Sequence, residues 1–550
     1  MMDQSSIPIF ARAPFAVSKA LRAWRARRSA HPPGLAPSAI ANVCILLVRR
    51  FDSVNVPPPA ACLGLSRGRI PVRRRFRLSP QQQSQASANS AQATASIPSG
   101  TVESAFAPHP AGFRLRRGRN WFFLGLLYAG YYLCRRNINI ASPELSAEFN
   151  FSNADYGKIG SSWAGGYAIG QFINGLFTDR IGGKVAMAVG AIATIILNIA
   201  FGLVSLSHIS WMLWAFIVIR AADGYLQAFG APGMVKINTS WFQRRERGKF
   251  AGIFGGMIQL GDLGVGQLGG LLLAGFSIPV IGWTLAKQDW RSMFFVPPAI
   301  LLVILALMWL NVKEHPEHTG YSIPHDDDAH GKDVEQKLSM GYVFKTIAGN
   351  ALAWVNAGAY FCTGFVRTAT VVWWTKYMFD QWKVGKTSGY YDALVWSLPI
   401  AAFVGSFSSG FLSDTLFSGK RAPVAALLYA FETLVILLTV YLLGHTALAG
   451  PLAAVVLLTA IAVTCNSTHS IIGTAAAMDL GGRKMAGFAA GVIDSFQYFG
   501  AMFAGWLLGG LIDKHGWMAL FWTMVPFSAA GTLLMTYIWL TTRGRDVKGS

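Results

Sequence analysis

Long apolar segments fill the sequence after residue 119, and they leave few folds open to the chain. A membrane-spanning helix needs about 20 mostly apolar residues. Segments of this kind lie at roughly 120–143, 158–178, 184–205, 210–233, 248–275, 291–312, 350–378, 388–412, 422–444, 449–473, 485–509 and 516–541. Because the bilayer core offers no hydrogen-bond partners to the backbone, each segment is expected to be helical. The sequence therefore predicts an all-α membrane protein with twelve transmembrane helices.

The net charge of +21 does not indicate a nucleic-acid-binding protein. Residues 1–119 hold 17 Arg and 1 Lys against 3 acidic residues, which is 18 − 3 = +15, so the rest of the chain accounts for only +6. The basic excess is thus mainly a property of residues 1–119, and the part before the first span, residues 1–112, lacks a long apolar run. Their Arg- and Ser-rich, acid-poor composition is typical of an organelle transit peptide, and it also fits disorder or translated sequence upstream of the true start.

The basic residues between the apolar segments predict the orientation of the chain. Clusters precede the first segment and follow the second, fourth, eighth, tenth and twelfth, while the opposite loops are poor in Lys and Arg. By the positive-inside rule both termini are expected to be cytoplasmic. The membrane would be the inner or plasma membrane, or an organelle envelope if the N-terminal segment is a transit peptide. The five cysteines show no paired spacing, so we expect no disulfide framework, no metal site and no cofactor.

The chain also repeats itself. The segment from Gly175 through Asp179 and Arg180 closes the second span, and a similar segment ending at Asp414 closes the eighth. The offset between the two aspartates is 414 − 179 = 235. The pair Arg135 and Arg367 has an offset of 232, and the pair Gly252 and Gly491 an offset of 239. Such near-equal offsets predict two six-helix halves at residues 113–312 and 350–545, joined by a cytoplasmic linker at residues 313–349. The four residues Gly175, Asp179, Arg180 and Asp414 are the candidates for a conformational role.

Arginines lie deep inside the first span of each half. Arg135 and Arg136 are in the segment 120–143, and Arg367 is in the segment 350–378, at an offset from Arg135 of 367 − 135 = 232. An arginine at membrane depth costs about 2.5–3.5 kcal/mol on insertion scales and usually serves a ligand. Since a guanidinium pairs two oxygens of a phosphate or carboxylate at once, one arginine from each half suits a compact dianion.

The motifs resemble those of one transporter superfamily. The run Gly-x-x-x-Asp-Arg-x-Gly-Gly-Lys at 175–184 is similar to the loop signature of the major facilitator superfamily. The first-span run from Tyr128 through Tyr132 to Arg135, Arg136 and Asn137 resembles the organophosphate:phosphate antiporter family, which includes glycerol-3-phosphate and hexose-phosphate transporters. The resemblance covers roughly residues 113–545. It implies a secondary transporter with the major facilitator fold and a monomeric state.

The resemblance also implies a set of substrate-binding residues. Arg135 and Arg367 would bind the phosphate of an organophosphate or of inorganic phosphate, with Arg136 beside them. Four tyrosines would line the path: Tyr128, Tyr132, Tyr167 and Tyr498. Apart from the resemblance, Gln171, Gln259 and His469 lie within predicted spans and are further candidates for this path. Glycerol-3-phosphate transporters carry a lysine at the position of Gln171 and a histidine near Ile258 and Gln259. These two differences predict a preference for a polyol or sugar phosphate, or another organic anion.

Two other functions stay open. Asp223, Asp262 and Asp494 lie within predicted spans, and as proton sites they would suit a proton-coupled symporter of a carboxylate or phosphonate. Asp223 is three residues after Arg220, so the two could instead neutralise each other on one helix face. A membrane sensor of sugar phosphates is the second alternative, because some members of the family bind without much transport. No soluble domain or nucleophile arrangement suggests an enzyme.

Overall fold

The computed structural model describes residues 110–542 except 243, 279–282, 322–348 and 418–419. Almost all of the predicted segment 1–112 and most of the linker 313–349 lie outside these residues. The first half contains α4 (Phe113–Phe149), α5 (Asn153–Ile181), α6 (Gly183–Val204), α7 (Met212–Gln227), α8 (Gly230–Trp241), α9 (Arg244–Ala274), η4 (Trp290–Phe294) and α10 (Val296–Asn311). The second contains α12 (Ala351–Trp382), α13 (Gly389–Leu416), α14 (Arg421–His445), α15 (Pro451–Ser470), α16 (Ala477–His515) and α17 (Met518–Thr542).

Three short elements complete the described chain. A hairpin of β1 (Phe276–Ile278) and β2 (Trp283–Leu285) joins α9 to η4, with the strands paired antiparallel. The short helix η5 (Pro316–Thr319) follows α10, and the π-helical turn η6 (Ile471–Ala476) joins α15 to α16. If α7 with α8 and η4 with α10 are each taken as one segment, the helices of the described residues follow the twelve predicted spans in order.

Hydropathy separates these segments into two groups. Eight helical segments of the described residues are long and apolar enough to cross a membrane: α6, η4 with α10, α13, α14, α15 and α17, and the main parts of α9 and α16. The segments outside this group are α4, α5, α7 with α8, and α12. Three of them contain the deep arginines Arg135, Arg220 and Arg367. Polar residues lower the hydropathy of these segments, and the deep arginines among them are of the type expected at a binding site.

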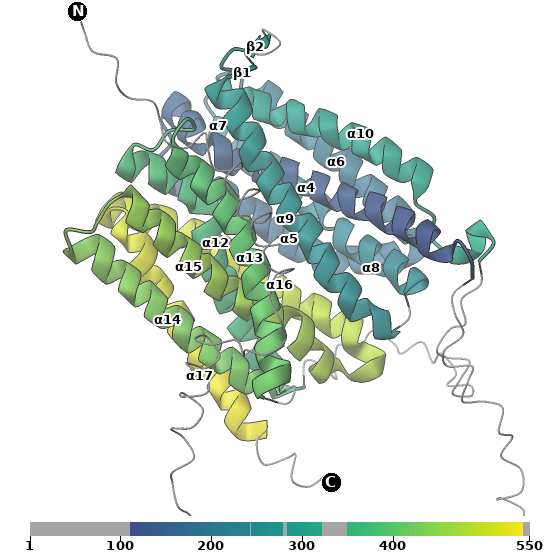
Figure 1. Ribbon diagram of the computed structural model, residues 1–550. Coiled ribbons are helices and arrows are strands. Elements are labelled where there is room, and N and C mark those ends of the chain that lie inside the picture. Colours follow the sequence, from purple (N-terminus) through teal and green to yellow (C-terminus); the bar gives the residue numbers. More distant parts are fainter. Residues whose placement is uncertain (1–109, 243, 279–282, 322–348, 418–419, 543–550) are drawn as a thin grey trace, which may run out of the picture. The chain divides into compact units, whose positions relative to one another are not determined.

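The helices pack in two equivalent six-helix halves, as predicted (Figure 1). The contacts of α4 with α9, α5 with α7 and α6 with α10 recur as those of α12 with α16, α13 with α15 and α14 with α17. Small residues mark the same crossing in each half. A Cβ on Gly261 would lie 2.6 Å from the Ala129 carbonyl oxygen, and one on Gly500 would lie 2.0 Å from that of Phe361. Only glycine permits these approaches, so α9 and α16 lie against α4 and α12 in the same manner.

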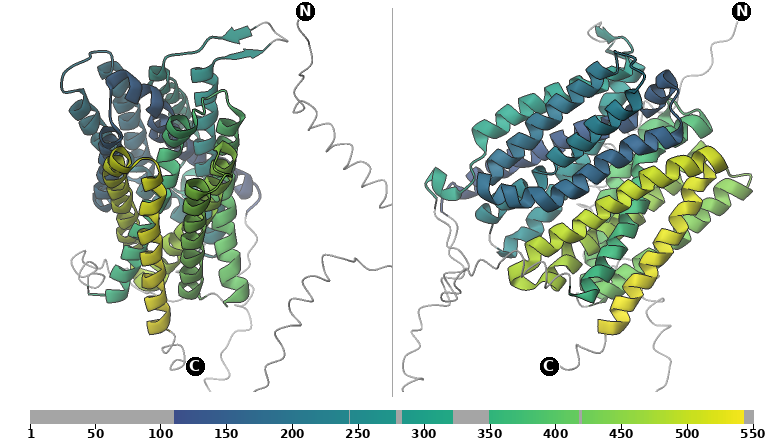
Figure 2. Two further views of the ribbon diagram at one scale, coloured as in Figure 1. Left: turned by 90° about the vertical axis from the view of Figure 1, so that its left-hand side faces the viewer. Right: turned by 180° about the vertical axis from the view of Figure 1, so that it is seen from behind.

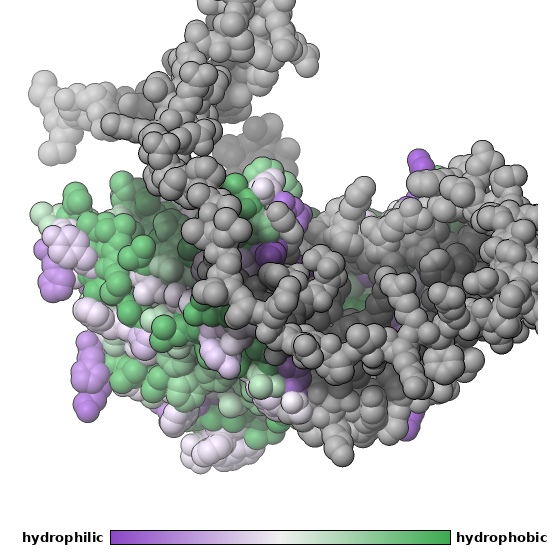
Figure 3. Space-filling model, turned by 90° about the horizontal axis from the view of Figure 1, so that it is seen from below, coloured by the Kyte–Doolittle hydropathy of each residue, from purple (hydrophilic) through white to green (hydrophobic). Residues whose placement is uncertain are grey.

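The outer surface of the helices suits a lipid environment. Large apolar side chains lie exposed on several helices, including Phe407 on α13, Leu434 on α14 and Leu533 on α17, the last of which is 72% exposed. In Figure 3 the coloured surface is mostly hydrophobic, and hydrophilic residues gather near its edges. A soluble protein rarely exposes such continuous apolar surface. The exposed face is therefore expected to contact acyl chains.

The two halves meet most closely along α5 and α16, which run side by side in the right-hand view of Figure 2. At the start of α5 the Asp513 carboxylate accepts hydrogen bonds from the backbone N–H groups of Asn153 and Ala154, at 3.0 and 2.8 Å. A Cβ on Gly157 would lie 2.2 Å from the Gly505 carbonyl oxygen, so the two backbones touch here. The negative charge of a carboxylate is stabilised by the positive end of the helix dipole at the N-terminus of α5. This end of the interface is thus closed.

The halves also meet where α9 packs against α13. This contact, too, is closed at the end of the molecule where α5 begins. The Tyr391 hydroxyl donates to the Gly266 carbonyl oxygen at 3.0 Å, and the Lys386 ammonium pairs with Glu144 at 2.8 Å. Most of the hydrogen bonds between the halves in the described part of the chain lie toward this end. The exception is one between Gln171 and Asp494 farther along α5 and α16.

Candidate substrate-binding site

Arg135 lies in an aromatic enclosure inside the first half. The residue is 4% exposed, and its guanidinium lies over the rings of Tyr132, Trp163 and Tyr167, with 4.4, 4.6 and 4.7 Å to the ring centroids. Aromatic faces attract a cation, and more strongly where water is excluded. The Nε atom donates to the Gln227 amide oxygen at 2.6 Å. Within the described residues the two Nη groups have no hydrogen-bond partner, so they are available to a ligand.

Arg367 is held by amides rather than by rings. Its Nε donates to the Asn466 amide oxygen at 3.2 Å. In the amide orientation that satisfies both of its neighbours, Gln497 accepts from Arg367 Nη1 and donates to Asp494 Oδ1, each at 3.2 Å. Gln227 on α7 and Asn466 on α15 belong to equivalent helices of the two halves. The same device, an amide oxygen on Nε, therefore orients both arginines. It leaves both Nη groups of Arg135 available to an anion, whereas Nη1 of Arg367 also binds Gln497.

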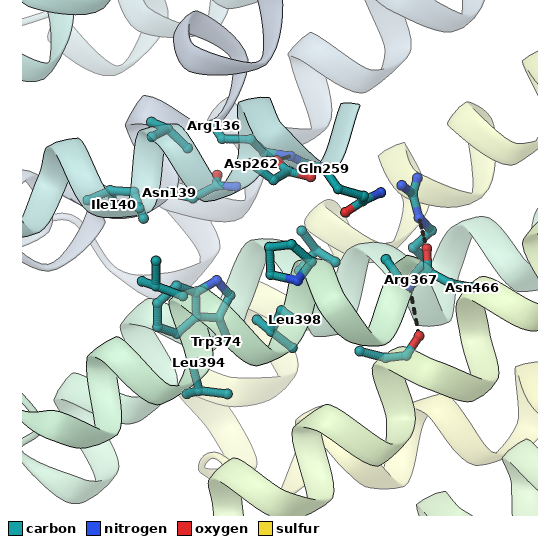
Figure 4. A pocket seen from close by; sticks show the side chains of 17 residues that line it. Arg136, Asn139, Ile140, Gln259, Asp262, Arg367, Trp374, Leu394, Leu398 and Asn466 are labelled. Atoms are coloured by element: carbon teal, nitrogen blue, oxygen red, sulfur yellow. Dashed lines mark hydrogen bonds and ion pairs between the residues drawn. The ribbon is translucent and has the colours of Figure 1, made fainter. Parts of the chain in front are cut away.

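A divided cavity lies between these arginines. One pocket, with about 700 Å³ of empty space that includes open solvent, is lined by Arg135, Arg136, Arg220, Arg367, Tyr132, Trp163, Thr368 and Tyr498, among others. A second, of about 580 Å³, is lined by Arg136, Gln259, Asp262, Arg367, Trp374 and Asn466, among others. Arg136, Asn139 and Arg367 line both, so the pockets adjoin. Figure 4 shows Arg136, Gln259 and Asp262 on the α4–α9 side and Arg367, Asn466 and Trp374 on the α12–α15 side.

The three predicted acidic residues have different partners. Asp223 pairs with Arg220 at 2.9 Å, deep in the first half. Asp262 pairs with Arg136, with 3.3 Å between Nε and the carboxylate, an interaction that sequence spacing did not reveal. Asp494 accepts from the Gln171 amide at 3.0 Å and from Gln497, and it pairs with no basic group in the described part of the chain. Two of the three acids are therefore neutralised by arginines.

Several predicted residues lie behind the cavity rather than on its wall. Tyr167 is fully buried and contacts Arg135 and the ring of Tyr498, while Tyr128 is buried against Tyr131 and Tyr132. His469 accepts or donates a hydrogen bond with the Tyr360 hydroxyl at 2.8 Å and stacks on its ring. None of the three is among the residues that line the two pockets. Their contacts suit them to position other groups of the site.

The loop after α5 has a backbone that requires glycine. Gly182 has φ +88°, and the Glu314 carboxylate accepts from the Gly183 N–H at 2.7 Å, which holds the start of α6 against the end of α10. Arg180 and Asp414 are exposed, and Gly175 has open space around it. The side chain of Asp179 lies outside the described residues. The conformational role of these four residues stays a prediction.

Sequence reasoning missed amides and rings that contact the arginines or line the two pockets. The missed residues are Asn139, Trp163, Gln227, Trp374, Asn466 and Gln497. A signal for two of them was present, because Gln227 and Asn466 are separated by one of the repeat offsets of the sequence. Among the described residues there is no group of three or more His, Cys, Asp or Glu side chains that could hold a metal ion.

The fold and the arrangement of this site define a secondary transporter built from two six-helix repeats. Residues 124–504 match the Major Facilitator Superfamily, and the chain belongs to that family. Among solved structures, a bacterial homologue of the human lysosomal transporter Spinster, in an inward-facing and unoccupied conformation, superposes with a TM-score of 0.58. At 17% identity, over 77% of this chain and 95% of that one, the match shows the shared fold.

Curated relatives support a narrower group. A probable hexose phosphate transport protein of Chlamydia pneumoniae is 27% identical over 449 residues, covering 78% of this chain and 92% of that protein. The membrane sensor protein UhpC of Escherichia coli K12 is 25% identical over 445 residues, covering 77% of this chain and 92% of that protein. The predicted resemblance to the organophosphate:phosphate antiporter family is confirmed by these similarities.

Proposed function

We propose that this protein exchanges a phosphorylated small metabolite, of the glycerol phosphate or sugar phosphate class, for inorganic phosphate by alternating access. The observation on which the proposal rests is the pair Arg135 and Arg367, one from each half, on the wall of one cavity. Each has its Nε bound to an amide, and such a fixed fork matches two phosphate oxygens. The names of the relatives support the same substrate class.

The charges of the site give a reason for exchange. With Arg136 and Arg220 paired to aspartates, Arg135 and Arg367 remain as two partly desolvated cations in separate halves. A conformational change that closes the halves around an empty site would bring these charges together at a cost. A bound phosphate neutralises both and lowers that cost. The change between inward-facing and outward-facing states is then coupled to the substrate, which makes the transport an exchange.

The orientation and assembly follow from the same reasoning. We place the basic loops and both termini in the cytoplasm, and the closed end of the α5–α16 interface on the opposite side. The cavity of this structure would then face inward. The transporter would work as a monomer, because each chain supplies both arginines of its own site. Residues 1–112 would take no part in transport.

The test is counterflow in proteoliposomes. Purified protein is reconstituted into vesicles loaded with phosphate. Uptake of labelled phosphate is measured at equal internal and external pH, with glucose 6-phosphate or glycerol 3-phosphate added as a competitor. We expect uptake to require phosphate or an ester on the opposite side and to need no proton gradient. Uptake that depends on an inward proton gradient and is lost in Asp262→Asn or Asp223→Asn would favour the proton-coupled symporter instead.

A sensor is the second candidate, since one relative is a membrane sensor protein. A sensor would bind the same phosphate ester through the same arginines. It would show ligand-dependent protection from thermal unfolding without counterflow above that of protein-free vesicles. The transport and binding measurements together distinguish the two functions.

A further inference from the structure

The two pockets of the cavity lie on different sides of α4 and α12. Beyond these two helices, the larger pocket is lined from α5, α7 and α16, and the smaller one from α9, α13 and α15. The smaller one is the α9–α13 pocket. Arg136, Asn139 and Arg367 line both pockets, so a single ligand can extend from one into the other. A molecule with two unlike ends can therefore place one end in each.

The larger pocket suits the phosphate end of such a molecule. It contains Arg135, and its α5–α16 side is filled by rings and backbone. The ring centroids of Tyr167 and Tyr498 are 4.3 Å apart, and the backbones of α5 and α16 touch at Gly157 and Gly505. An organic group attached to a phosphate on the two arginines thus has more room toward the α9–α13 pocket than toward α16.

The α9–α13 pocket has two unlike walls (Figure 4). The wall on α4 and α9 carries polar groups, which are those of Arg136, Asn139, Gln259 and Asp262. On α12 and α13, by contrast, every lining side chain except Arg367 is apolar or aromatic, including those of Trp374, Leu394 and Leu398. Inorganic phosphate gains nothing from an apolar wall, because its oxygens need hydrogen-bond donors. A sugar ring has C–H faces and a rim of hydroxyl groups, and it fits between two such walls.

Trp374 is the one aromatic side chain of the apolar wall. Its ring lies against that of Tyr391, with 5.5 Å between the centroids, and the Tyr391 hydroxyl binds the Gly266 carbonyl oxygen of α9. The indole is therefore held in place from behind. In the described part of the chain its Nε1 has no hydrogen-bond partner, and unlike the Nε1 atoms of Trp163 and Trp373 it is not completely buried. The indole thus offers an apolar face and a donor to a ligand.

We propose that the α9–α13 pocket binds the organic part of the substrate, with a sugar ring lying against Trp374, so that a cyclic sugar phosphate is preferred over a glycerol phosphate. This inference rests on the proposed function. The phosphate lies on Arg135 and Arg367, and the ring hydroxyls face the amides of Asn139 and Gln259. The three-carbon chain of a glycerol phosphate covers little of the apolar wall, and inorganic phosphate covers none of it.

The experiment compares inorganic phosphate, glycerol 3-phosphate and glucose 6-phosphate as external substrates of phosphate-loaded proteoliposomes. In the wild type we expect a lower KM for glucose 6-phosphate than for glycerol 3-phosphate. In Trp374→Ala, KM for glucose 6-phosphate should rise at least about tenfold more than KM for inorganic phosphate, because an aromatic contact is lost. Trp374→Phe keeps an aromatic face and should retain most of the preference.

Two further variants complete the design. Leu398→Trp places a large side chain in the α9–α13 pocket and should impair glucose 6-phosphate uptake more than phosphate uptake. The matched control is Trp396→Ala, since Trp396 lies on α13, is 51% exposed and lines neither pocket. It should change neither KM. Thermal unfolding in detergent shows whether each variant is folded, and Trp374→Ala alone decides the inference if Leu398→Trp is not.

Two results would overturn the inference. Equal changes in KM for inorganic phosphate and glucose 6-phosphate in Trp374→Ala would mean that the indole supports the contact of α12 with α13 and not the substrate. A wild-type protein that prefers glycerol 3-phosphate would leave the apolar wall without a role in binding. Both differ from failure of the proposed function, in which the wild type would exchange none of the three probes.

Discussion

The two halves place an arginine in the same position but support it differently. In the first half Arg135 is enclosed by Tyr132, Trp163 and Tyr167, within one bundle. In the second half Arg367 is bound to Asn466 and Gln497, and the chain of amides continues through Asp494 to Gln171 in the first half. Arg135 is thus a fixed group of its own half, while Arg367 is connected to the interface that has to change during transport.

This comparison shows which part of the repeat is kept and which part differs. The amide on Nε is present in both halves, because an arginine needs a fixed plane to bind two oxygens of one phosphate. The surroundings differ, because aromatic rings enclose Arg135, whereas amides connect Arg367 to Asp494.

The largest expected effect is at the arginines themselves. Arg135→Lys and Arg367→Lys keep the charge but lose the two-pronged contact, so exchange should fall about 100-fold in each, and further in the alanine variants. Phosphate counterflow in proteoliposomes measures it. If either half tolerates lysine and alanine with wild-type rates, the site is not shared equally between the halves and the comparison fails.

The second effect tests whether Gln227 and Asn466, whose amide oxygens accept from the Nε atoms of the two arginines, are equally important. Gln227→Leu and Asn466→Leu each remove one hydrogen bond to a charged group, which is expected to raise KM for phosphate about tenfold. The aromatic enclosure gives Arg135 additional support, so Gln227→Leu should have the smaller effect of the two. A larger effect of Gln227→Leu would show that the rings do not hold Arg135 in place.

A third, smaller effect concerns the closed end of the interface. Asp513→Asn weakens the hydrogen bonds to the Asn153 and Ala154 N–H groups and removes the charge at the start of α5. The closed end should open more often, and exchange should change by a few fold. In a cysteine-free background, Ala164→Cys should react faster with a membrane-impermeant maleimide added from the side opposite the basic loops. Unchanged labelling would mean that the glycine contacts alone keep this end closed.

The smallest effect compares two acids at equivalent positions, Glu148 and Asp380, which are separated by the same offset as Arg135 and Arg367. Glu148, beyond the apolar segment 120–143, binds Trp290 and Arg291 and so joins α4 to η4, whereas Asp380 pairs with Lys376 on its own helix. Glu148→Gln should cost about 1 kcal/mol at neutral pH and Asp380→Asn less, measured by thermal unfolding in detergent. Similar losses in both variants would contradict this difference between the halves.

The first of these two acids has a defined pH dependence. Burial raises the pKa of Glu148, but the hydrogen bonds from Arg291 and Trp290 outweigh it and hold the pKa below the ordinary value. A carboxyl group whose pKa is lowered by folding stabilises the protein above its unfolded pKa of about 4.3, and this contribution is lost as the pH falls through the folded value. The difference between the wild type and Glu148→Gln should therefore shrink below about pH 4.

The sequence predicted the features that depend on local pattern or on repeated spacing. Apolar segments about 20 residues long specify helices in a bilayer, whatever their neighbours. An arginine inside such a segment is costly enough to mark a functional position by itself, which is why Arg135 and Arg367 could be chosen without a structure. The repeat offsets then predicted two equivalent halves, and the packing of the helices confirmed them.

Only the tertiary structure decided which polar groups meet. Gln227 is 92 residues from Arg135, Asn466 is 99 from Arg367, and Gln171 is 323 from Asp494. Spacing along a helix revealed the pair Arg220 and Asp223, three residues apart, but it could not show that Arg136 neutralises Asp262 on another helix. The sequence therefore determined the helices, their two halves and the two arginines that they bury. The packing of helices from distant parts of the chain determined the partner of each charge, because a hydrogen bond or ion pair depends on separation in space and not on separation in sequence.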